Sequence, residues 1–109
     1  MQIRLITLVA AAVFSVSAYS ADFLADRHVA RGANCAACHT TQPPKAVPAK
    51  QCLTCHGSYE KLAQRTENLD VNPHDSHMGE LECTECHKGH KKPQLVCDQC
   101  HEFRQLKIR

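Results

Sequence analysis

Eight cysteines, arranged as four pairs that are each followed at once by a histidine, carry the clearest chemistry in this 109-residue chain. Two residues separate the cysteines of a pair, and every cysteine of the chain belongs to one. On one helical turn, residues i, i+3 and i+4 share a face. Two thiols can therefore form thioethers with one haem while the histidine reaches its iron, so each motif is typical of c-type haem attachment. The motifs are Cys35-Ala-Ala-Cys38-His39, Cys52-Leu-Thr-Cys55-His56, Cys83-Thr-Glu-Cys86-His87 and Cys97-Asp-Gln-Cys100-His101.

Three other uses of paired cysteines are possible. A disulfide framework suits a small secreted chain but does not explain a histidine after every pair. A zinc site could be built from Cys83 and Cys86 together with Cys97 and Cys100, but it would leave the following histidines idle. A thioredoxin-like redox pair needs an α/β scaffold, and the sequence shows no such pattern. The motifs therefore favour four covalently bound haem c groups.

The remaining histidines match the number of ligands that four haems still need. The chain has eight histidines; four follow the cysteine pairs, and the others are His28, His74, His77 and His90. If these four complete the axial ligation, both faces of every iron are closed and no substrate reaches the metal. This favours electron transfer over catalysis at haem, and we expect a carrier and not an enzyme. Catalysis at an open iron is the alternative, and binding of CO or cyanide would reveal it.

The N-terminal residues are typical of an export signal. A basic start, Met1 to Arg4, precedes an apolar run from Leu5 to Val16 that is too short to span a bilayer. Small residues at Ala18 and Ser20 predict cleavage after Ser20. We therefore expect a signal peptide over residues 1–20, one domain over residues 21–109, a periplasmic location and no membrane span after cleavage.

The composition leaves little material for an ordinary core. The chain has no Trp, 5% aromatic residues and a formal net charge of +2 without a concentrated basic stripe. This pattern argues against a nucleic-acid binder and against a large enzyme with its own catalytic core. A domain this small buries little surface, so a large cofactor must fill its interior.

The elements that position the motifs are predicted to be short. A helix is expected over residues 21–31, ending near Gly32, and a proline-containing loop over residues 40–51. Ser58 is a predicted N-cap for a helix from Tyr59 to Leu69, whose apolar face we expect to pack on haem. No convincing strand pattern is present. The predicted fold class is small and mostly irregular, with short α-helices organised by haem.

Taken together, these features resemble a known family. The chain is similar to the tetrahaem domain of periplasmic flavocytochrome c fumarate reductases and to the related small tetrahaem cytochromes c. The resemblance runs from about Ala21 to Phe103. The residues that carry it are Ala21-Asp22 with His28, Cys-x-x-Cys-His-Gly at 52–57, His74-x-x-His77, Cys83-x-x-Cys-His-x-x-His90 and Cys97-Asp-x-Cys-His-x-Phe103.

The resemblance implies a ligand assignment and a physiological role. It pairs His28 with His39, His74 with His56, His77 with His87, and His90 with His101. In fused members a flavin domain follows in the same chain, whereas this sequence reaches Arg109 without an FAD-binding Gly-rich loop. We therefore expect an electron carrier in anaerobic respiration that donates to a separate flavoprotein reductase of fumarate-like substrates. The alternative is a general periplasmic shuttle between a membrane quinol dehydrogenase and several reductases.

Overall fold

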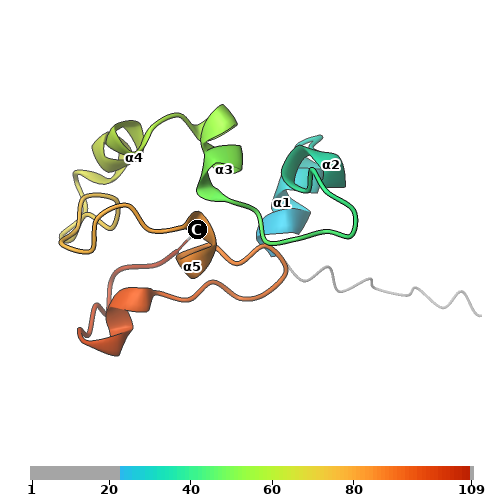
Figure 1. Cartoon of the computed structure of the whole chain (residues 1–109). Helices are drawn as coiled ribbons and strands as arrows, with labels where there is room; N and C mark the ends of the chain where they lie inside the picture. The colour runs from blue at the N-terminus through green and yellow to red at the C-terminus, as the bar shows by residue number, and fades with distance from the viewer. Residues whose placement is uncertain (1–22, 109) are drawn as a thin grey trace, which may run out of the picture.

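The computed structural model describes residues 23–108, which form short helices joined by long loops (Figure 1). None of these residues lies in a β-strand, and none of their helices is long and apolar enough to cross a lipid bilayer. The predicted fold class, mostly irregular with short helices, is confirmed. The predicted signal peptide, residues 1–20, lies outside the described residues. The elements are α1 (Leu24–Ala30), α2 (Cys35–Cys38), α3 (Ala49–His56), α4 (Tyr59–Thr66), α5 (Cys83–Cys86) and the 3-10 helix η1 (Val96–Gln99).

Two helices end where glycine allows the backbone to turn sharply. The helix predicted over residues 21–31 is found as α1, and Gly32 follows it with a φ of 93°. Gly57 ends α3 with a φ of 91°, and its N–H donates to the carbonyl of Leu53 at 2.9 Å. Residues other than glycine rarely adopt such φ values. Each of these glycines therefore ends a helix next to a segment that carries a predicted ligand.

The start of α3 differs from the prediction. Residues 40–51 were expected to form a loop, but α3 begins inside this range, at Ala49. The side chain of Glu82 accepts a hydrogen bond from the Ala49 N–H at 2.6 Å and so satisfies one free donor of the first turn. Because Glu82 immediately precedes α5, the same contact ties α3 to α5. The sequence analysis missed this cap because the two residues lie far apart along the chain.

The end of α4 also differs from the prediction. Ser58 caps the helix as expected, and its hydroxyl accepts from the backbone N–H three residues further on. The helix ends at Thr66, however, and not at Leu69. The side-chain amide of Asn72 donates to the carbonyl of Ala63 at 2.9 Å, which is the acceptor that the next helical turn would use. The chain therefore leaves the helix one turn early.

Hydrogen bonds between distant segments hold the cysteine motifs near one another. The amide of Gln51 in α3 donates to the carbonyl of Ala37 in α2 at 2.8 Å. The N–H of Ala25 in α1 donates to the carbonyl of Gly89, which follows the third motif, at 2.9 Å. Helices α3 and α5 also pack against each other. The motifs are thereby gathered although the chain between them is largely irregular.

The side chains alone form almost no core. Among the described residues, Leu95 is the one buried hydrophobic side chain, with 9% of its surface exposed. Val29, Leu69 and Met78 have about half of their surfaces exposed, at 57%, 46% and 50%. This confirms the small apolar core that the composition predicted. A chain of this size cannot offset its conformational entropy with so little burial, so another component must stabilise it.

Candidate haem-binding sites

Each cysteine motif forms a helical turn that the following histidine closes. The backbone N–H of the motif histidine donates to the carbonyl of the first cysteine in three motifs, at 2.9 Å for His39, 2.8 Å for His87 and 2.8 Å for His101. The fourth of these motif histidines, His56, is the last residue of α3. This turn places the two thiols and the imidazole near one face, as attachment of one haem requires.

The cysteines are available for attachment to a cofactor. All eight are free thiols and lie at least partly exposed. Within residues 23–108 no three His, Cys, Asp or Glu side chains are gathered to hold a metal ion, so the four cysteines considered for zinc do not form a cluster. The thiols of Cys52 and Cys83 are neighbours, which brings the second and third motifs together. Burial, and then the nearby Cys83 thiol, raises the pKa of Cys52 to about 11.

The eight histidines form four ring pairs, and each pair combines one motif histidine with one of the others. The distances between ring centres fall in a narrow range, from 6.0 to 6.3 Å. The pairs are His28–His56 at 6.0 Å, His39–His90 at 6.1 Å, His74–His87 at 6.3 Å and His77–His101 at 6.1 Å.

This spacing fits a single metal ion between the two rings of each pair. Two imidazole nitrogens on opposite sides of one metal ion, each at the usual bond length of about 2.0–2.1 Å, place their ring centres about 6 Å apart. The ring planes are nearly parallel in His39–His90 and His74–His87, at 10° and 4°. They are steeply inclined in His28–His56 and His77–His101, at 67° and 66°. The donor set of each site, two thiols and two imidazoles, therefore fits a haem c group.

The resemblance implied ligand pairs that differ from the ring pairs of this structure. It paired His28 with His39, whereas the ring of His28 faces His56 and the ring of His39 faces His90. The other partners change in the same way. The remaining implied pairs were His74 with His56, His77 with His87 and His90 with His101, where the structure has His74–His87 and His77–His101.

The physical reason lies in the hydrogen bonds between segments. Three of the four implied pairs joined histidines that are 10 or 11 residues apart in sequence. The bond from Ala25 to Gly89 instead carries His90 alongside α1, and the bond from Gln51 to Ala37 sets α3 beside α2. Each motif histidine consequently meets a ring from a different stretch of chain.

Hydrogen bonds orient three of the rings. The Nδ1 atoms of His28 and His39 lie 2.8 and 3.1 Å from the backbone carbonyls of Leu24 and Lys45. Because a carbonyl only accepts, these Nδ1 atoms carry the hydrogen and the Nε2 lone pairs remain free for a metal ion. The Nδ1 of His74 lies 3.1 Å from a side-chain hydroxyl, that of Thr66.

Burial keeps one of the pairs in the form that binds metal. The pKa of His74 is lowered by burial, and the pKa of His87 is lowered by burial and then by the nearby His74 and Arg27 charges. Neutral imidazole is the ligating form of histidine. The environment of this pair therefore favours metal binding over protonation.

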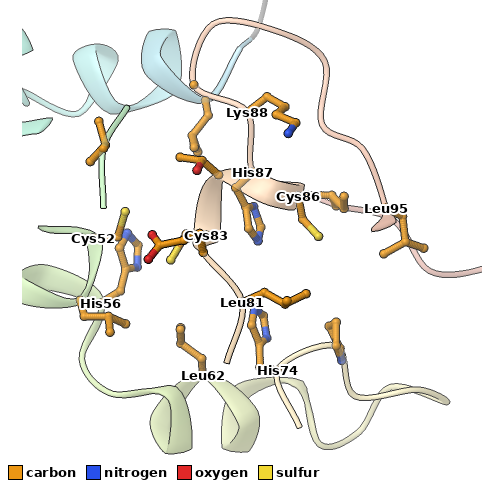
Figure 2. A pocket seen from close by; sticks show the side chains of 18 of the residues that line it. Cys52, His56, Leu62, His74, Leu81, Cys83, Cys86, His87, Lys88 and Leu95 are labelled. Atoms are coloured by element: carbon orange, nitrogen blue, oxygen red, sulfur yellow. The ribbon is translucent and has the colours of Figure 1, made fainter. Parts of the chain in front are cut away.

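Three of the four pairs line one cavity of about 1180 Å³. This exceeds the range of about 300–1,000 Å³ that is usual for small-molecule pockets. Figure 2 shows the rings of His74 and His87 reaching into it, with Cys52 and Cys83 to one side and Leu62 and Leu81 nearby. The predicted apolar face of α4 contributes Tyr59, Leu62 and Thr66 to the lining. The fourth pair, His77–His101, is not among the lining residues.

Comparison with known proteins agrees with this geometry. Residues 27–102 match the cytochrome c3 family. This chain belongs to that family. This cytochrome is therefore a multihaem electron-transfer protein with covalently bound haem c, and its resemblance to flavocytochrome c fumarate reductases is confirmed.

Its relatives are larger proteins. The cytochrome is 41% identical over 75 residues to the probable fumarate reductase Ifc3 of Shewanella frigidimarina, covering 64% of this chain and 12% of that protein. It is 41% identical over 49 residues to the cytochrome c-type protein Cgr1 of Eggerthella lenta, covering 44% of this chain and 23% of that protein. Its structure matches a flavocytochrome c3 fumarate reductase in the open conformation, with a TM-score of 0.66 and 37% identity, over 79% of this chain and 15% of that one. The chain spans less than a quarter of each of these relatives.

Sequence reasoning missed the residues that support the ligands. The sequence analysis gave neither Thr66 nor Asn72 a role beside a predicted ligand. Glu82, which joins α3 to α5, was not singled out. A side-chain donor or acceptor close in sequence to a non-motif histidine, as in Asn72-Pro73-His74, was the available signal.

Proposed function

We propose that this cytochrome binds four haem c groups, each attached to one cysteine motif and ligated by two histidines. The observation that supports it is the set of four ring pairs near 6 Å, which uses every histidine once. The four sites are Cys35, Cys38, His39 and His90; Cys52, Cys55, His56 and His28; Cys83, Cys86, His87 and His74; and Cys97, Cys100, His101 and His77.

The chemistry of these sites is electron transfer. Haem c, when bound, supplies an iron that takes up and releases one electron. The residues of this chain orient the imidazole rings that would hold each haem and keep three of the four sites around one cavity. If both histidines of a pair bound the haem iron, no position would remain for a substrate, and we therefore propose a carrier and not an enzyme.

We further propose that the carrier works in the periplasm and donates electrons to a separate flavin-dependent reductase of fumarate-like substrates during anaerobic respiration. The predicted signal peptide over residues 1–20 supports export to the periplasm. Two relatives are named as fumarate reductases, and the chain matches only 12–15% of their length. In this proposal a flavin-dependent reductase is the partner that accepts electrons, and a membrane quinol dehydrogenase is the source of electrons.

A general shuttle that serves several reductases is the second candidate. The similarity to Cgr1, which is named as a cytochrome c-type protein, favours it. The two candidates share the haem sites and differ only in the range of acceptors that oxidise the protein.

The haem content is tested on protein isolated from the periplasm. Mass spectrometry should show cleavage after Ser20 and four added haem groups, and the absorption and EPR spectra should show only low-spin iron that does not bind CO. Fewer than four haems, or a high-spin iron that binds CO, would contradict the proposed sites.

The role is tested by mixing the reduced cytochrome with a purified flavoprotein fumarate reductase from the same organism. Addition of fumarate should oxidise the cytochrome rapidly, whereas the cytochrome alone should reduce no fumarate with an artificial electron donor. Fumarate turnover by the isolated cytochrome would overturn the assignment as a carrier. Oxidation by several unrelated reductases at equal rates would favour the general shuttle.

A further inference from the structure

One hydroxyl group at the end of α4 lies within hydrogen-bond distance of four polar atoms. Thr66 Oγ1 is 2.6 Å from Asn72 Oδ1, 3.0 Å from the Leu62 carbonyl, 3.1 Å from His74 Nδ1 and 3.4 Å from the Ala63 carbonyl. A threonine hydroxyl has one hydrogen to donate and two lone pairs that accept. Only one of these four atoms can therefore be its principal acceptor.

The orientation of the Asn72 amide decides which atom accepts. Its Nδ2 donates to the Ala63 carbonyl at 2.9 Å, and its Oδ1 also accepts from the backbone N–H of His74 at 3.1 Å. This places the carbonyl oxygen of Asn72, which has no hydrogen, 2.6 Å from the Thr66 hydroxyl. Two oxygens so close repel unless a hydrogen lies between them, so the Thr66 hydroxyl donates to Asn72.

The hydrogen between Thr66 and His74 then belongs to the imidazole. With its own hydrogen directed at Asn72, the Thr66 oxygen presents a lone pair to His74. The Nδ1 of His74 consequently carries its hydrogen and donates it, and the Nε2 lone pair is free. The ring of His74 lies 6.3 Å from that of His87 and 4° from parallel to it.

We propose that Thr66, held by Asn72, is a positioning residue that fixes the tautomer and ring plane of His74 as an iron ligand and lowers the reduction potential of that iron. The proposal rests on the proposed function, because it requires haem at the third motif. A hydrogen bond from Nδ1–H makes an imidazole a stronger donor, which favours ferric over ferrous iron. The hydroxyl is itself polarised by its bond to Asn72, which makes it a better acceptor.

The ring of His74 is oriented differently from the rings of His28 and His39. His28 and His39 are oriented by backbone carbonyls, which remain whatever side chain the acceptor residue carries. Of these three rings, only His74 depends on a side chain. The potential at the third motif can therefore be changed by a single substitution without altering a ligand.

The test uses the haem-loaded protein and three variants. Thr66→Val keeps the shape of the side chain and removes the hydroxyl, whereas Thr66→Ser keeps the hydroxyl. Thr41→Val is the matched control, because the Thr41 hydroxyl lies in an exposed loop and contacts only the Pro43 carbonyl. Each protein is titrated potentiometrically while the haem absorption is followed, and its EPR spectrum is recorded.

In Thr66→Val, one of the four one-electron steps should move to a higher potential. The expected change in its equilibrium constant is up to about tenfold, which corresponds to about 59 mV for one electron. Thr66→Ser and Thr41→Val should titrate like the wild type. Appearance of one high-spin iron in Thr66→Val, with recovery in Thr66→Ser, would equally support the positioning role.

A Thr66→Val protein with four low-spin haems and unchanged potentials would overturn the proposal while leaving the proposed function intact. Asn72→Ala provides a second measurement if Thr66→Val assembles poorly, and it should shift the same step in the same direction by a smaller factor. No shift in Asn72→Ala would then contradict the proposal. A wild-type protein without low-spin haem would instead refute the proposed function.

Discussion

The three ligand pairs that share the cavity differ from the fourth pair at the C-terminal end in how they are enclosed. Each cavity pair contains at least one half-buried ring, whereas His77 and His101 are both exposed. The cavity motifs lie on α-helical turns, and the fourth lies on the 3-10 helix η1. Its enclosure is local, since the ring of Phe103 stacks on His101 with ring centres 5.2 Å apart. The difference indicates that the cavity sites depend on one another and that the fourth is largely independent.

The largest effect is expected when haem is absent from both regions. If the chain is produced in the cytoplasm without haem attachment, we expect no cooperative thermal unfolding by circular dichroism, because Leu95 is the one buried hydrophobic side chain among residues 23–108. The control is the same chain exported and loaded with haem, which should unfold cooperatively. A cooperative transition in the apo-protein would show that the side chains suffice to form the fold.

The next largest effect is expected from replacing one predicted ligand in each region, and it distinguishes the two regions. His77→Ala should give one high-spin iron that binds CO readily, with the other three haems unchanged, because its site is exposed and separate. His90→Ala should also give one high-spin iron but should shift the potentials of neighbouring haems, because its site opens into the shared cavity. Absorption spectra and redox titrations measure both outcomes. Equal effects of the two substitutions on the remaining haems would contradict the independence of the fourth site.

A smaller effect is expected from truncating the most enclosed side chain beside the cavity. Leu95→Ala should lower the free energy of unfolding of the haem-loaded protein by about 2–3 kcal/mol, at the lower end of buried Leu-to-Ala changes, since few neighbours surround it. Denaturant unfolding followed by haem absorption gives the value. Val29→Ala is the control, because Val29 is 57% exposed and does not line the cavity, so its truncation should change stability little. A similar loss in both variants would show that Leu95 has no special role.

The smallest effect concerns the local enclosure of the fourth site. Phe103→Ala should lower the free energy of unfolding by about 0.5–1.5 kcal/mol, the usual contribution of an aromatic pair. Phe103→Tyr should keep most of this stabilisation. The spectra of the three cavity haems should stay unchanged. Perturbation of those haems, seen by EPR or NMR, would mean that the C-terminal site is coupled to the cavity after all.

The sequence predicts the local parts of this protein well. The cysteine spacing predicts motif turns, Ser58 predicts the start of α4, and Gly32 marks the end of α1, because each depends on a few neighbouring residues. The list of eight histidines was likewise available from counting, although their ligation is still a proposal. The absence of a large core followed from composition.

What the sequence could not predict depends on contacts between distant segments. The partner of each ring is set by bonds such as Ala25 to Gly89 and Gln51 to Ala37, which no local pattern reveals. The start of α3 at Ala49 depends on Glu82, and the early end of α4 depends on Asn72. The ligand pairs that the resemblance implied therefore differ from the ring pairs of the structure at all four sites.

A crystal structure of the haem-loaded protein tests the central claim most directly, because it shows which two histidines bind each iron. The expected result is four irons, each about 2.0 Å from two Nε2 atoms. His39 should share its iron with His90, and His56 should share its iron with His28. An iron bound by His28 together with His39, or by His90 together with His101, would contradict the pairing on which this account depends.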